Sequence, residues 1–155
     1  MKALFTNKNT WYKFLKILLS WLGTPYAHWQ MEKKKGADCG LFIAACLKEF
    51  KIINDINFKR QDRFWHQFTE NEIILNIIKD IKSEYYKFVK VDSNKLIKGD
   101  ILLFNIRSKL SNHAAVYFGN NFMINSLNGK GVCIKHIDSS YFKRLTNVYR
   151  IYKCQ

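Results

Sequence analysis

The sequence predicts a single α+β domain over residues 1–155, in which helices come first and an antiparallel sheet follows. Apolar residues in the first half recur at helical spacing. The second half alternates short apolar runs with Gly and Asn turns, and we find no internal repeat or linker. A length of 155 residues fits one domain, and the 48% of hydrophobic residues excludes an intrinsically disordered chain.

The first predicted element is an amphipathic helix from Thr10 to about Leu22. Lys13 and Lys16 interrupt its apolar stretch and no small-residue cleavage site follows, so we expect a helix of the domain and no signal peptide. The sequence has no run of ~18 apolar residues, so no membrane span is expected. The apolar side chains near one face are Trp11, Phe14, Leu15, Leu18, Leu19 and Leu22.

Two further helices are predicted in the first half. After a turn at residues 23–26 and a polar loop, Asp38 is placed to cap a helix that begins at Cys39 and runs to about Phe50. This helix is apolar on nearly every side, which is typical of a buried helix. Residues 51–68 are expected to be an irregular connection. Thr69 and Glu72 then fit a capping box for a helix that runs to about Tyr86.

The second half is predicted to form an antiparallel sheet because its short strands are joined by Gly/Asn turns. One of these turns is at residues 119–121 and another is at Asn128–Gly129. The expected strands are Ile101–Ile106, His113–Phe118, Phe122–Ser126, Val132–Lys135 and Val148–Tyr152.

Three residues in this arrangement could form a nucleophilic site. Cys39 is at the start of a helix, where the backbone N–H groups and the helix dipole lower a thiol pKa. His113 begins a strand of the sheet that would pack on this helix, and Asn125 follows on the next strand, where it could orient the imidazole. Each residue also has an ordinary structural interpretation: a packed cysteine, a hydrogen-bonded histidine and a polar residue beside a turn.

The charge and the cysteines limit the other possibilities. With 26 basic and 12 acidic residues, the net charge is 26 − 12 = +14, which indicates either attraction to a polyanion or a solvated lysine coat. A nucleic-acid binder is a third possibility, but no helix-turn-helix, zinc-finger or RNP pattern accompanies the charge. The four cysteines lack zinc-ligand spacing, so we expect mostly free thiols, no metal and no cofactor.

Four motifs occur in an order that resembles the NlpC/P60 family of papain-like cysteine peptidases. They are Ser-Trp-Leu-Gly-Thr-Pro-Tyr (20–26), Lys-Gly-Ala-Asp-Cys-Gly-Leu-Phe-Ile (35–43), Gly-Asp-Ile-Leu-Leu-Phe (99–104) and His-Ala-Ala-Val-Tyr-Phe-Gly-Asn (113–120). The stretches 65–72, 122–126 and 143–150 look like the phage-tail and gene-transfer-agent branch of this family. The resemblance extends from about Leu19 to Tyr152 and implies a papain-like fold, with the Cys-bearing helix packed on the C-terminal sheet.

The resemblance also implies a role for each matching residue. Cys39 matches the nucleophile, His113 the general base and later acid, and Asn125 falls at the third, His-orienting position. Tyr26 matches a family tyrosine whose hydroxyl could help to stabilise the oxyanion, and Asp38 matches the acidic residue before the nucleophile. In the phage-tail branch the third position is usually His. An Asn can still accept the imidazole N–H.

The implied activity is hydrolysis of an amide bond in the peptide stem of bacterial peptidoglycan by acyl transfer to Cys39. Phage-tail or gene-transfer-agent tail proteins are the expected partners, with no specific nucleic acid. We expect a protein made in the bacterial cytoplasm, carried by a tail particle and acting on the cell wall. The alternative is a catalytically weak or inactive relative that serves as a structural tail protein or binds the wall.

Overall fold

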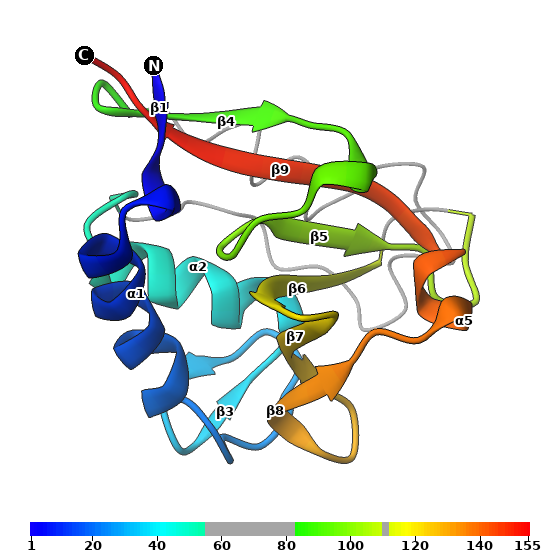
Figure 1. The fold of residues 1–155 in the computed structure, drawn as a ribbon. Helices are drawn as coiled ribbons and strands as arrows, with labels where there is room; N and C mark the ends of the chain where they lie inside the picture. Colours follow the sequence, from blue (N-terminus) through cyan, green and yellow to red (C-terminus); the bar gives the residue numbers. More distant parts are fainter. Residues whose placement is uncertain (55–82, 110–111) are drawn as a thin grey trace.

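The structure is a computed structural model that describes residues 1–54, 83–109 and 112–155. Two helices lie on one side of a seven-stranded antiparallel sheet (Figure 1). The strand order is β1-β9-β5-β6-β7-β8, and β4 pairs with β9. The sheet strands are β1 (Lys2–Ala3), β4 (Tyr86–Lys90), β5 (Ile101–Phe104), β6 (His113–Gly119), β7 (Phe122–Leu127), β8 (Gly131–His136) and β9 (Leu145–Lys153).

The remaining elements are short, apart from the two long helices. A small hairpin, β2–β3, comes directly before the second helix, and one-turn helices connect other segments. These elements are η1 (Leu4–Thr6), α1 (Lys8–Ser20), β2 (Met31–Glu32), β3 (Gly36–Ala37), α2 (Cys39–Glu49), η2 (Ser93–Lys95) and α5 (Ser139–Phe142).

Helix α1 forms close to its predicted position. Asn7 caps it by accepting a hydrogen bond from the Thr10 N–H at 3.0 Å, so the helix begins two residues earlier than expected. Phe14 and Leu18 are buried as predicted, but Leu19 and Leu22 are exposed, which corrects two members of the apolar face. Leu19 is about 100° around the helix from Leu18, and Leu22 follows the end of the helix.

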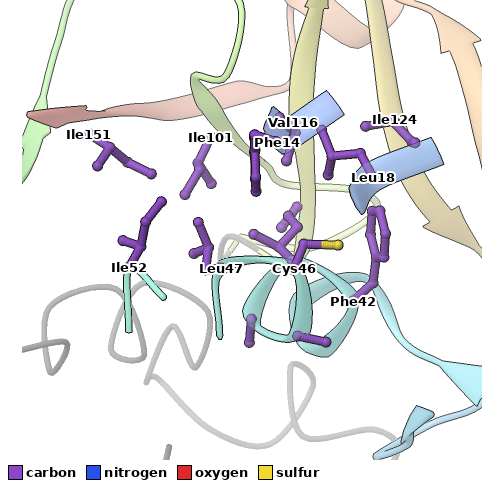
Figure 2. Packing of buried hydrophobic residues seen from close by; sticks show 14 of the residues in the cluster. Phe14, Leu18, Phe42, Cys46, Leu47, Ile52, Ile101, Val116, Ile124 and Ile151 are labelled. Carbon is purple, nitrogen blue, oxygen red and sulfur yellow. The ribbon is translucent and has the colours of Figure 1, made fainter. Parts of the chain in front are cut away.

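Helix α2 is the centre of the core. It packs against β6 and β7 and against α1, and eight of its eleven residues are buried. The prediction of a buried helix from Cys39 to about Phe50, packed on the C-terminal sheet, is therefore confirmed. Figure 2 shows Cys46 on this helix among apolar side chains of α1 and the sheet, such as Leu18 and Val116.

The five predicted strands of the second half are all present, with ends that differ by up to three residues. Strand β5 is buried along its length. Ile101 and Leu103 join the core under the helices, whereas Leu102 and Phe104 join a second cluster on the opposite face of the sheet. The turn at residues 119–121 has a positive φ at each position, which Gly and Asn tolerate best.

The structure corrects the predicted end of the third helix, which was expected to run from Thr69 to about Tyr86. Residues 83–85 are not helical and Tyr86–Lys90 forms β4, so the predicted helix does not reach Tyr86. The capping box at Thr69 and Glu72 and the stretch 65–72 lie outside the described residues. In the described ranges, no helix is long and apolar enough to cross a membrane.

Candidate active site

Asp38 fixes the start of helix α2 and connects it to a neighbouring loop. One carboxylate oxygen accepts a hydrogen bond from the Leu41 N–H at 2.8 Å, which confirms the predicted helix cap. The other oxygen accepts a hydrogen bond from the Trp29 N–H at 3.0 Å. Asp38 therefore holds the loop after Tyr26 against the helix end that carries Cys39.

The Cys39 sulfur lies against the backbone on either side of His113. The sulfur is 4.0 Å from the carbonyl oxygen of Asn112, which accepts from the thiol, and the Ala114 N–H also interacts with the sulfur. Both Asn112 and Ala114 are neighbours of His113 in the chain. The packing of α2 on β6 thus brings together two residues that are 113 − 39 = 74 positions apart.

His113 and Asn125 are hydrogen-bonded partners on neighbouring strands. The Nε2 atom of His113 is 3.0 Å from the Nδ2 atom of Asn125, and both side chains are buried. Strands β6 and β7 are antiparallel neighbours joined by a tight turn. The start of β6, which carries His113, therefore lies beside the end of β7, near which Asn125 is placed. The sequence predicted this placement from the turn and the spacing.

Cys133 is a member of this cluster that the sequence analysis did not predict. It lies on β8 directly opposite Asn125, and its sulfur donates to the Asn125 Oδ1 atom at 3.7 Å. The ring of Phe104, the register partner of His113 on β5, lies 6.0 Å from the His113 ring. The predicted turn at Asn128–Gly129 could have identified Cys133, because a hairpin around this turn pairs Asn125 with Cys133.

Tyr26 lies in an irregular segment next to helix α2. The Ala37 N–H donates to the Pro25 carbonyl at 3.0 Å, and the Ala27 N–H donates to the Ala37 carbonyl at 3.3 Å. These contacts fix the backbone of the half-buried Tyr26 beside Ala37, which is two positions before Cys39. The structure therefore brings the Tyr26 segment, Asp38 and Cys39 together at one end of α2.

Burial dominates the electrostatics of Cys39. Burial and the negative charge of Asp38 raise the pKa of the Cys39 thiol to about 12. The backbone N–H groups at the helix start lower this pKa, as the sequence predicted, but their effect is smaller. The expected net lowering of the Cys39 pKa is therefore wrong for this closed site.

The other two ionisable groups of the site are also shifted by burial. Burial lowers the pKa of His113 to about 4. Burial raises the pKa of Asp38 as well, although hydrogen bonds from the Leu41 and Trp29 N–H groups and the nearby His28 oppose the shift. At neutral pH, Cys39 and His113 are consequently both neutral, and the resting site holds a thiol and an imidazole.

The model of the NlpC/P60 family matches residues 23–150. The chain belongs to the NlpC/P60 family. The match contains the Tyr26 segment, the helix that carries Cys39 and the strands that carry His113 and Asn125. The predicted papain-like α+β fold, with its Cys-bearing helix packed on an antiparallel sheet, is confirmed by this match and by the structure.

The chain is also similar in sequence to a named relative. It is 26% identical over 125 residues to a Haemophilus influenzae protein named "Probable endopeptidase NlpC homolog", and this stretch covers 80% of the chain and 53% of the relative. The chain thus spans about half the length of that relative.

Two solved structures share the fold of the NlpC/P60 chain. The NlpC/p60 domain of the peptidoglycan hydrolase SagA matches 89% of the chain and 96% of its own length, at 14% identity and a TM-score of 0.58. RipD from Mycobacterium tuberculosis, described as a non-catalytic NlpC/p60 domain protein adapted to peptidoglycan binding, matches 90% of the chain and 95% of its own length, at 14% identity and a TM-score of 0.54. The fold therefore occurs in both a hydrolase and a non-catalytic protein.

Proposed function

We propose that this NlpC/P60 protein is a cysteine peptidase that hydrolyses amide bonds in the stem peptides of peptidoglycan. One observation carries the proposal. The Cys39 sulfur contacts the backbone on both sides of His113, while the Asn125 side chain is 3.0 Å from the Nε2 atom of that imidazole. A cysteine nucleophile, a histidine base and a group that orients the histidine are the parts that amide hydrolysis by a cysteine needs.

In the proposed mechanism, His113 acts as a general base during the attack. Because the thiol and the imidazole are both neutral at rest, the Cys39 proton moves to Nδ1 of His113 as the sulfur–carbon bond forms. Asn125 faces Nε2, so Nδ1 takes this proton when the ring's own proton is on Nε2 and the Asn125 Oδ1 atom accepts it. The carbonyl becomes a tetrahedral oxyanion, for which the Cys39 N–H and the Tyr26 hydroxyl are the proposed donors.

The same imidazole completes the reaction. His113 returns the proton to the leaving amine as the carbon–nitrogen bond breaks, and a thioester on Cys39 remains. Water then gives a proton to His113 and attacks the thioester, and the carbon–sulfur bond breaks as Cys39 regains its proton. No other reactant is required.

The charge supports the wall as substrate. Stem peptides carry carboxylates, and a net charge of 26 − 12 = +14 attracts a polyanionic surface. We further propose that the protein acts as a tail-associated enzyme of a phage or gene-transfer particle, delivered from the cytoplasm where it is made to the cell wall. The branch-like stretches 122–126 and 143–150 support this delivery.

A wall-binding protein without catalysis is the second candidate function. The observation that favours it is the closed site itself, in which the Cys39 thiol has a pKa of about 12 and Asn125 stands where the branch usually has His. RipD shows that the fold supports such a role in another protein.

Digestion of purified peptidoglycan separates the two candidates. We expect the wild-type protein to release peptide fragments that mass spectrometry identifies, and Cys39→Ala to release none while it retains the wild-type circular dichroism spectrum. Cys154→Ala, which changes a free cysteine near the C-terminus, is the matched control and is expected to release the same fragments. Sedimentation of both proteins with the wall, without fragments from either, would favour the binding function.

A further inference from the structure

A series of polar contacts connects His113 to Asn125 and Cys133 across the neighbouring strands β6, β7 and β8. The Cys133 sulfur on β8 is 3.7 Å from Oδ1 of Asn125 on β7, and Nδ2 of Asn125 is 3.0 Å from Nε2 of His113 on β6. Cys133 and Asn125 are direct register partners, and the Asn125 side chain is completely buried. Cys133 thus contacts one end of the amide group whose other end contacts the imidazole.

The orientation of the Asn125 amide decides which nitrogen of His113 carries the proton. A neutral imidazole has one N–H donor and one acceptor nitrogen, and the amide has a donor end and an acceptor end. In the structure, Nε2 of His113 faces the Nδ2–H group of Asn125. Nε2 therefore has to accept the hydrogen bond, and the ring proton is on Nδ1. If the amide were turned by half a rotation, Oδ1 would face the ring and the proton would move to Nε2.

The two tautomers differ in their ability to take a proton from Cys39. Asn125 covers Nε2, so the proton has to be accepted at Nδ1. In the structure, Nδ1 already carries the proton and has no free lone pair, while the lone pair of Nε2 accepts from Asn125, so neither ring nitrogen is free to take the Cys39 proton. The orientation of Asn125 in the structure is therefore a resting one, and the turned orientation is the productive one.

We propose that Cys133 is a positioning residue that stabilises the resting orientation of Asn125 by donating its S–H to Oδ1. Cys133 then sets the tautomer of His113 through Asn125 and keeps the peptidase partly latent, without touching substrate. The effect on tautomer follows from the three contacts alone. Its effect on activity rests on the proposed peptidase function.

Nitrogen NMR of the His113 ring tests the proposal directly, because a protonated and an unprotonated ring nitrogen have well-separated chemical shifts. We expect Nδ1–H in the wild-type protein. Cys133→Ala removes the donor and is expected to shift the tautomer ratio toward Nε2–H by roughly fivefold, the factor that one ordinary hydrogen bond contributes. Cys133→Ser keeps a donor and is expected to retain Nδ1–H.

Two controls make the test specific. Cys154→Ala is expected to leave the ratio unchanged. Asn125→Asp presents only acceptor oxygens to the ring, so it is expected to fix Nε2–H above the pKa of the ring, and adding Cys133→Ala to it is expected to change nothing. An unchanged ratio in Cys133→Ala, an equal shift in Cys133→Ser, or an undiminished shift in the Asn125→Asp background would overturn the proposal.

The failure of this inference is distinguishable from the failure of the proposed function. The tautomer is measured without turnover, so a protein that releases no peptide fragments can still show the Cys133-dependent ratio. In an active protein, we expect Cys133→Ala to raise the rate of fragment release and Cys133→Ser to leave it at the wild-type level. A rate that falls in Cys133→Ala while the ratio shifts toward Nε2–H would overturn the latency.

Discussion

We expect acid to destabilise the protein through His113. Burial holds its pKa at about 4 in the folded state, whereas an unfolded histidine titrates near 6.5. Because the folded pKa is the lower one, the unfolded chain binds the proton first as the pH falls. The stability that neutral His113 contributes is therefore complete above about pH 6.5 and is lost between about pH 6.5 and pH 4.

The size of this loss follows from the difference between the two pKa values. At about pH 4.5 the unfolded histidine is charged and the folded one is still mostly neutral, so the linkage relation gives a loss of roughly 2.5 kcal/mol relative to pH 7. Asp38 acts in the opposite direction, because burial raises its folded pKa and acid relieves the cost of its charge. A comparison of variants that all retain Asp38 cancels this contribution.

Urea denaturation at pH 7 and at about pH 4.5 measures the loss. We expect the free energy of unfolding to fall by roughly 2.5 kcal/mol more in the wild-type protein than in His113→Gln, which is neutral at both pH values. His136→Gln changes an exposed histidine on β8 and is the matched control, expected to follow the wild type. An equal fall in the wild type and His113→Gln would refute the reasoning from burial.

Two further predictions concern hydrogen bonds of the half-buried Asp38 carboxylate and the buried Asp100 carboxylate. Asp38→Ala removes the acceptors of the Leu41 and Trp29 N–H groups and is expected to lower the free energy of unfolding, measured by urea denaturation, by about 2–4 kcal/mol. Asp38→Asn keeps one acceptor and is expected to lower it less. Equal losses in the two variants would contradict the role of both hydrogen bonds. Arg150→Met leaves the buried Asp100 without its two 2.8 Å contacts and is expected to cost about 3 kcal/mol; a loss below about 1 kcal/mol would contradict it.

The sequence was most informative where local patterns and turns determine structure. The cap at Asp38, the buried helix that follows it and the Gly/Asn turns all depend on neighbouring residues, and each was predicted. Strand β4 was missed because the helix that was predicted from Thr69 was extended to Tyr86. The short alternation of apolar Tyr86 and Phe88 with polar Lys87 was compatible with a strand.

The sequence predicted that His113 and Asn125 lie close together, but it predicted neither the direction of the Cys39 pKa shift nor the place of Cys133. The turn between β6 and β7 placed His113 near Asn125. The pKa of Cys39 depends on how deeply the whole fold buries the sulfur, and the helix start alone gave the wrong direction. Cys133 contacts Asn125 across a second hairpin, so its place in the cluster depended on a strand register that we did not infer.

The most direct test of whether Cys39 and His113 act as one catalytic unit is to measure fragment release by three variants: Cys39→Ala, His113→Ala and the double variant. Each single variant removes the transfer of the Cys39 proton to His113, so we expect both to lose nearly as much activity as the double variant. Losses in the single variants that multiply in the double variant, or a His113→Ala protein with wild-type release, would contradict the proposed mechanism.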